Sequence, residues 1–132
     1  EEFMEVREHP FHTYEILRRI PAFADFCFDA AAHHERLDGH GYWRGLASDE
    51  ISLTARILAV ADVFDALRAK RPYRDALPME KVFSIMRDDA PHALDAACLA
   101  ALMECKKEAQ STQTGAPVQN AAPSVQTSPI RR

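Results

Sequence analysis

The chain has 132 residues, 47% of them hydrophobic, which fits one globular domain at most. Its formal net charge is -4, so it offers no basic surface for bulk nucleic-acid binding. No apolar run approaches the roughly 20 residues of a membrane span, and the first residues do not form a signal peptide. The three cysteines have no C-x-x-C spacing, which is typical of reduced thiols in the cytoplasm, where we expect the protein.

Apolar residues recur at helical spacing along most of the chain, and no segment alternates as a strand does. Five helices are predicted, over residues 8–20, 21–34, 52–69, 78–88 and 95–109. Asp95 is the expected N-cap of the last helix. Gln, Ser, Thr, Pro and Ala dominate after it, which predicts a disordered tail over residues 110–132. The expected fold class is therefore all-α.

The stretch from His33 to Leu46 contains three of the six histidines and three of the four glycines. His33 and His34 lie on the last turn of a predicted helix, where successive side chains point about 100° apart. Neutral imidazole is the commonest side-chain metal ligand, so this stretch suggests a metal site. Histidines that only cap a helix or face solvent are also common, and His9 alone fits that description.

The helix predicted over residues 52–69 is apolar on two opposite sides, which indicates burial on both. Asp62 lies in the middle of the second side, half a turn from Leu53. Because an unpaired buried carboxylate is costly, we expect Asp62 to contact a cation, either a metal ion or an arginine such as Arg56. Asp65 lies at the edge of the same side.

Residues 71–74, Arg-Pro-Tyr-Arg, form a predicted turn with two guanidinium groups three residues apart. Arginine is well suited to bidentate contacts with phosphate. Arginines that follow a helix are, however, often only solvated, so the turn by itself is suggestive and no more.

Taken together, four motifs resemble the HD-GYP family, the bacterial phosphodiesterases of the HD superfamily that hydrolyse cyclic di-GMP. In chain order the motifs are His9-Pro10, His33-His34-Glu35 with Asp38-Gly39 and Gly41-Tyr42, Arg56–Leu67, and Arg71–Arg74. The match runs from about His9 to Leu102. The resemblance implies an all-α helical bundle that holds two or three divalent metal ions, commonly iron or manganese, and takes a cyclic dinucleotide as its substrate.

The resemblance also implies roles for single residues. The positions that match metal ligands of the family are His9, His33, His34 and Asp62. Arg71 and Arg74 match a basic pair that holds the substrate phosphate. The loop that begins the Gly-Tyr-Pro motif, a surface associated with signalling-protein partners, is matched by Asp38, Gly41 and Tyr42. Asp65 is expected to orient a metal ligand or an arginine without binding the metal itself.

Two features depart from the family pattern. Trp43 stands where the family has proline, so the loop loses a fixed backbone angle, which affects partner recognition more than catalysis. The His-Asp dyad that names the superfamily is absent from the sequence, as is the lysine motif expected after it. We expect both upstream of residue 1, so that residues 1–109 are the C-terminal part of an HD-GYP domain, N-terminally truncated and inactive alone.

Two alternatives stay open on the sequence. One is a degenerate HD-GYP module, which binds a cyclic dinucleotide or a signalling partner without turnover. The missing dyad and Trp43 motivate this alternative. The other is a helical domain whose histidines are structural, which would bind no metal and would lose no stability in the presence of a chelator.

Overall fold

A computed structural model describes the backbone of residues 2–114 and the side chains of residues 7–109. Its helices are α1 (Glu2–Leu17), η1 (Pro21–Phe23), α2 (Cys27–Ala31), η2 (Ala32–His34), η3 (Ser48–Glu50), α3 (Leu53–Arg68), α4 (Met79–Asp89) and α5 (Ala96–Thr114), where η marks a 3-10 turn. Residues 2–114 contain no strand, only two isolated bridges. The all-α prediction is confirmed.

Capping side chains explain where two of the helices begin. The Ser52 hydroxyl accepts a hydrogen bond from the Ala55 amide at 3.1 Å, which starts α3. The Asp95 carboxylate accepts from the amides of Ala97 and Cys98 at 2.9 and 3.0 Å, which starts α5. These three bonds satisfy amides that the first turn of a helix leaves without a partner. The predicted starts of these helices, and Asp95 as N-cap, are confirmed.

The predicted single helix over residues 21–34 is wrong, because the structure has η1, α2 and η2 in its place. Residues 18–26 are all exposed, Phe23 and Phe26 among them, so no tertiary packing supports a longer helix there. Two boundaries lie further out than predicted, since α1 begins at Glu2 and α5 continues to Thr114, whereas α1 ends earlier, at Leu17. The rest of the expected disordered tail, residues 115–132, lies outside the described residues.

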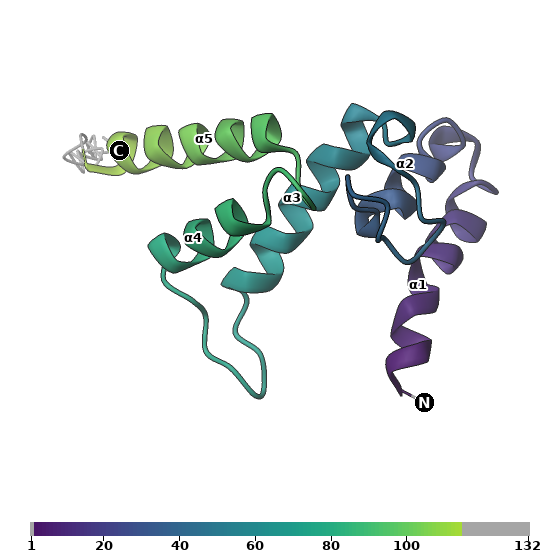
Figure 1. Cartoon of the computed structure of the whole chain (residues 1–132), viewed down its shortest axis with the longest axis horizontal. Helices are drawn as coiled ribbons and strands as arrows, with labels where there is room; N and C mark the ends of the chain where they lie inside the picture. Colours follow the sequence, from purple (N-terminus) through teal and green to yellow (C-terminus); the bar gives the residue numbers. More distant parts are fainter. Residues whose placement is uncertain (1, 115–132) are drawn as a thin grey trace, which may run out of the picture.

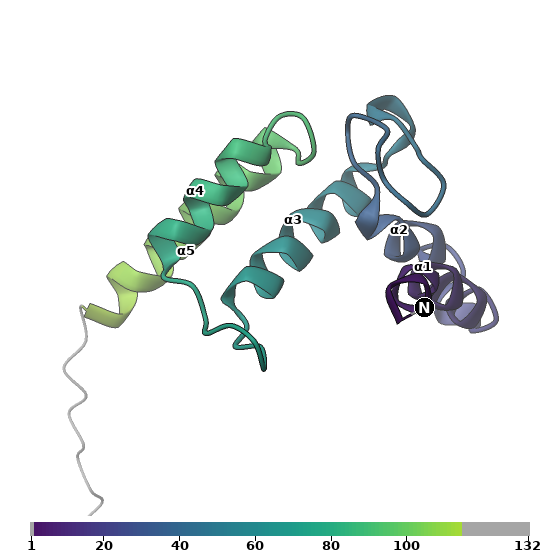
Figure 2. The same ribbon diagram turned by 60° about the horizontal axis from the view of Figure 1, so that its bottom comes forward.

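The helices gather into two groups joined by α3 (Figure 1). Helices α4 and α5 lie side by side and both pack against α3, and α1, α2 and η2 lie toward the N-terminal end of α3. The turned view in Figure 2 gives the same arrangement. None of the helices in the described part of the chain is long and apolar enough to cross a bilayer.

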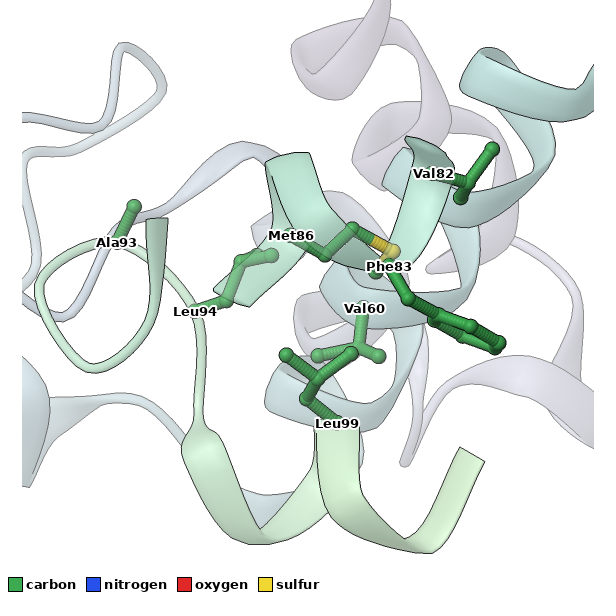
Figure 3. Packing of buried hydrophobic residues seen from close by; sticks show 7 residues of the cluster. All are labelled: Val60, Val82, Phe83, Met86, Ala93, Leu94 and Leu99. Atoms are coloured by element: carbon green, nitrogen blue, oxygen red, sulfur yellow. The ribbon is translucent and has the colours of Figure 1, made fainter. Parts of the chain in front are cut away.

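Each group has its own hydrophobic cluster. In the first, side chains from α3, α4, α5 and the loop before α5 interlock (Figure 3); they are Val60, Val82, Phe83, Met86, Ala93, Leu94 and Leu99. The second cluster joins Ala32 of η2 to Ile51 and Ala55, with Trp43, Leu37 and Leu46 packed against it. The second cluster covers α3 at Ala55, and the first covers it at Val60 and, on the same face, toward its C-terminal end.

The prediction that α3 is buried on both sides is wrong for this chain. On one side Leu53 and Ile57 are 65% and 51% exposed, and on the other Asp62 and Asp65 are exposed. Each side is covered over only half its length, by η2 near Ala55 and by α4 and α5 near Val60. No described element packs over the remainder, which explains why a helix of this apolar composition has two solvent-facing patches.

Candidate metal centre

Three histidines from two separate segments converge on one point. His9 comes from α1, and His33 and His34 come from η2. The Nε2 atom of His9 lies 3.1 Å from that of His33 and 3.0 Å from that of His34. Potential ligand atoms of the three side chains lie within 4.8 Å of one another. The sequence motifs for these residues therefore meet in space.

The local fold explains this convergence. Helix α1 packs against α2 and η2, which carries His9 toward the end of α2 (Figure 1). At that end the helix tightens into the 3-10 turn η2, as helix termini often do. The rings of His33 and His34 are 4.2 Å apart between centroids, and both approach His9.

A backbone carbonyl fixes the proton on His33. Its Nδ1 atom lies 2.6 Å from the carbonyl oxygen of Ala30, which can only accept a hydrogen bond. In the neutral ring the proton therefore sits on Nδ1, and Nε2 presents its lone pair toward His9. Hydrogen bonding of one ring nitrogen to a carbonyl is the usual way in which a metal-binding histidine is oriented.

Burial keeps His34 neutral. It lowers the pKa of His34 to about 4, with further lowering by His33 and His9 and an opposing effect of the Asp62 carboxylate. A metal ligand must be unprotonated, so His34 is ready to bind a cation at neutral pH. Three imidazoles with a nearby carboxylate form a donor set that suits iron, manganese or zinc. The residues present therefore fit a divalent cation.

Asp62 lies near this group but is not part of it. It is exposed and outside the 4.8 Å cluster, although its negative charge acts to raise the pKa of both His34 and Tyr42. The alternative pairing with Arg56 is wrong, because Arg56 donates to Asp95 at 3.0 Å instead. Asp62 and Asp65 form no ion pair with any described residue.

The loop after η2 closes over the histidines. The ring of Tyr42 stacks on His34, with centroids 4.7 Å apart and planes inclined by 29°. The Arg7 guanidinium lies 5.0 Å from the centre of the same Tyr42 ring. Asp38 shapes the turn by accepting from the Arg36 side chain at 3.0 and 2.6 Å and from the His40 amide at 3.1 Å, which together hold the pKa of this carboxyl well below its usual range.

The Arg71–Arg74 turn is confirmed by a pair of backbone hydrogen bonds between these residues, at 2.8 and 3.1 Å. The Arg74 guanidinium donates to the Ala66 carbonyl of α3 at 2.7 Å, whereas the Arg71 side chain is exposed. The turn follows the C-terminal end of α3, whereas η2, which carries two of the histidines, packs against α3 near Ala55. The described residues thus do not bring the arginines into contact with the histidines.

Glu35 is a residue that the sequence motifs contained but to which they gave no role. Its side chain is 3% exposed, the one buried charged residue in the described part of the chain. The carboxylate accepts hydrogen bonds from the amides of Arg44, Gly45 and Leu46. A signal existed in the sequence: an acid directly follows the histidine pair, and a glycine-rich loop that can fold back onto it comes next.

Trp43, the departure from the family pattern, packs inward. Its ring contacts Tyr14 of α1 and Phe28 of α2, with centroids 5.9 and 5.1 Å away. The Arg44 guanidinium covers Trp43 at 4.7 Å from the ring centre. The tryptophan therefore joins the loop to α1, which carries His9, and to α2, which leads directly into η2 and its two histidines.

Comparison with known proteins shows the family of the chain. Residues 1–98 match the family described as HD domain. The chain is 48% identical over 101 residues to 3'3'-cGAMP-specific phosphodiesterase 3 of Vibrio cholerae, an alignment that covers 76% of this chain and 22% of that protein. It is 41% identical over 103 residues to the cyclic di-GMP phosphodiesterase response regulator RpfG of Xanthomonas campestris, covering 74% of this chain and 26% of that protein.

A cyclic di-GMP phosphodiesterase of Thermotoga maritima is 42% identical over 85 residues, which cover 63% of this chain and 23% of that protein. The chain belongs to the HD domain family, in the HD-GYP branch that its motifs and these relatives define. It spans about a quarter of the length of the relatives it matches, at 22%, 26% and 23%.

Proposed function

We propose that this chain is the metal-binding portion of a cyclic dinucleotide phosphodiesterase, with cyclic di-GMP as the substrate. The observation that carries the proposal is the meeting of three imidazoles at one point, with Nε2 atoms 3.0 and 3.1 Å from that of His9. The names of the relatives supply the substrate class: several are cyclic di-GMP phosphodiesterases, and others are specific for 3'3'-cGAMP.

His9, His33 and His34 would bind the cation, with Asp62 as a carboxylate ligand. The hydrogen bond from His33 to Ala30 and the low pKa of His34 support this role, because both favour lone pairs that are free to coordinate. A divalent cation bound there would neutralise phosphoryl charge and make bound water acidic enough to supply hydroxide near neutral pH. We propose two or three ions of iron or manganese in the complete domain.

The two arginines would hold the phosphate, in different ways. Arg71 is exposed and can extend toward an anionic ligand, whereas Arg74 is tied to the end of α3 by its bond to Ala66. Guanidinium groups can bind two phosphate oxygens at once, which orients the phosphodiester for attack. Asp65 would contribute by orienting one of these groups from the exposed side of α3.

The activity is proposed for the full-length protein, since this chain has no His-Asp dyad and is expected to be inactive alone. We also propose a cytoplasmic location and a signalling partner at the loop that contains Gly41 and Tyr42. A module that binds the nucleotide without turnover is the second candidate. Trp43 favours it, because this aromatic replaces the proline of the family loop and anchors that loop to α1 and α2.

The experiment is hydrolysis by the full-length protein, purified without oxygen and loaded with iron or manganese. Cyclic di-GMP and 3'3'-cGAMP are supplied separately, and the products are separated by liquid chromatography. We expect turnover of cyclic di-GMP that His33→Ala and Asp62→Ala each abolish, while the exposed His12→Ala retains it. Binding without product would support the second candidate. Activity of both ligand variants within about tenfold of wild type would overturn the site.

A further inference from the structure

Glu35 presents a buried carboxylate that no cation neutralises among the described residues. Its partners are three backbone amides from one short loop, those of Arg44, Gly45 and Leu46. Oε1 accepts from the first two, and Oε2 accepts from Leu46 at 3.0 Å. Since a buried charge is costly without such bonds, the carboxylate and the loop depend on each other.

Gly41 brings the same loop into close contact with Glu35. A Cβ atom at this position would lie 2.2 Å from Glu35 Oε2, 2.6 Å from Glu35 Cα and 2.9 Å from the carbonyl oxygen of His34. No side chain fits there without displacing the backbone of Glu35 or the loop. The loop is thus pressed onto the residue that directly follows the two histidines.

The next residue in the loop, Tyr42, reaches the metal centre. Its ring stacks on His34, and His33 and His9 lie close to the same imidazole, with centroids 4.2 and 4.7 Å away. His34 is therefore enclosed by three rings. Among the described residues, His9 is the hydrogen-bond partner of the His34 Nε2 atom, so packing by Tyr42 is a main restraint on the ring.

We propose that Glu35 is a positioning residue of the metal centre. It locks the loop of residues 41–46 through three backbone amides, and the locked loop holds Tyr42 against His34 so that the imidazole faces His9. The proposal rests on the metal site of the proposed function but not on any substrate. Residues that orient metal ligands in this way commonly affect metal affinity about 10- to 100-fold.

The test compares Glu35→Gln with the matched control Glu50→Gln in this chain. Glu50 also accepts from a loop amide, that of Ala47 at 3.0 Å, but it is exposed and lies away from the histidines. Trp43 is the only tryptophan, so its fluorescence reports the loop directly. Three readouts are measured: helical circular dichroism, acrylamide quenching of Trp43, and affinity for Mn²⁺ by calorimetry.

For Glu35→Gln we expect retained helicity, stronger quenching of Trp43 and Mn²⁺ affinity at least about tenfold weaker, with no change in Glu50→Gln. Quenching and affinity equal to wild type in a folded Glu35→Gln would overturn the proposal. If wild type binds no Mn²⁺, the proposed metal site fails, and the quenching comparison still decides whether Glu35 locks the loop.

A second variant guards against loss of folding in Glu35→Gln. Tyr42→Leu leaves Glu35 and its three amide bonds in place and removes the ring that packs on His34. We expect weaker Mn²⁺ binding with unchanged quenching of Trp43. The double variant of Glu35→Gln and Tyr42→Leu should bind Mn²⁺ no more weakly than the weaker of the two single variants. Unchanged Mn²⁺ binding in Tyr42→Leu would overturn the role of the loop in holding His34.

Discussion

His9 and His33 are 24 residues apart in the chain, yet their Nε2 atoms lie 3.1 Å apart. The contact exists because α1 packs back onto α2 and η2, and because η2 ends in two adjacent histidines. It makes the histidine cluster, the candidate metal centre, a product of tertiary packing between α1 and η2 rather than of one local motif.

Arg71 and Arg74 are expected to differ in their effect on stability. Arg74→Ala removes the bond to the Ala66 carbonyl and should lower the free energy of unfolding by about 1 kcal/mol. Arg71→Ala should leave it unchanged, since this side chain is exposed. Urea denaturation of the chain measures both. On the proposed function, both variants should also lower kcat/KM for the cyclic dinucleotide in the full-length protein. Equal losses of stability in the two variants would contradict the structural difference.

The stability of the chain should depend on pH through Asp95. The Cys98 amide, with help from the Arg56 guanidinium, holds the pKa of Asp95 below its ordinary value. A depressed folded-state pKa contributes stability above the ordinary carboxyl value, about 3.9, and that contribution is lost as pH falls through the folded pKa. Asp95→Asn should therefore destabilise at pH 7 and much less at acidic pH.

Denaturation of Asp95→Asn and wild type across this pH range checks the sign. The matched control is Asp75→Asn, whose exposed pair with Lys70 at 3.6 Å should contribute little at any pH. A stability difference that grew toward acidic pH would contradict the assignment.

The first hydrophobic cluster is expected to carry much of the stability. Met86 is fully buried between α3 and α5, so Met86→Ala should cost about 2–5 kcal/mol through lost packing and the cavity left behind. Ile57→Ala, at a site 51% exposed, should change the free energy of unfolding by less than about 1 kcal/mol. Thermal denaturation distinguishes the two, and a larger loss in Ile57→Ala would show that its face of α3 is covered.

Trp43 should stabilise the histidine-bearing group. Trp43→Ala removes contacts with Tyr14 and Phe28 and should lower the free energy of unfolding by about 2 kcal/mol. The measurement is again urea denaturation, with His40→Ala in the same loop as an exposed control. An unchanged midpoint in Trp43→Ala would mean that the ring does not anchor the loop.

The sequence predicted the helices whose ends carry capping residues. Ser52 and Asp95 mark the starts of α3 and α5, and in the structure the side chain of each accepts a hydrogen bond from a backbone amide of its helix. The prediction of one helix over residues 21–34 is wrong because a periodic apolar pattern does not show whether another element covers it. Here Phe23 and Phe26 face solvent. The predicted burial of Asp62 is wrong for the same reason, because it depends on another element packing over that side of α3, and Asp62 is exposed here.

For the site, His9, His33 and His34 were predicted from their resemblance to a family pattern, and spacing alone would not have joined them. No local feature of the sequence predicts that α1 folds back onto η2. Glu35 gained its role only from the structure, because a buried acid is recognised by the amides around it. Arg71 and Arg74 were predicted as one pair, whereas the structure gives Arg74 an additional contact with α3.

The most direct test of the metal centre is the metal content of this chain, purified without oxygen and dialysed against Mn²⁺, for wild type, His9→Ala and His12→Ala. His12 lies on the same helix but is exposed and outside the cluster. We expect about one ion per chain in wild type and His12→Ala, and none in His9→Ala. Equal metal in all three proteins, or none in wild type, would contradict a site built by His9, His33 and His34.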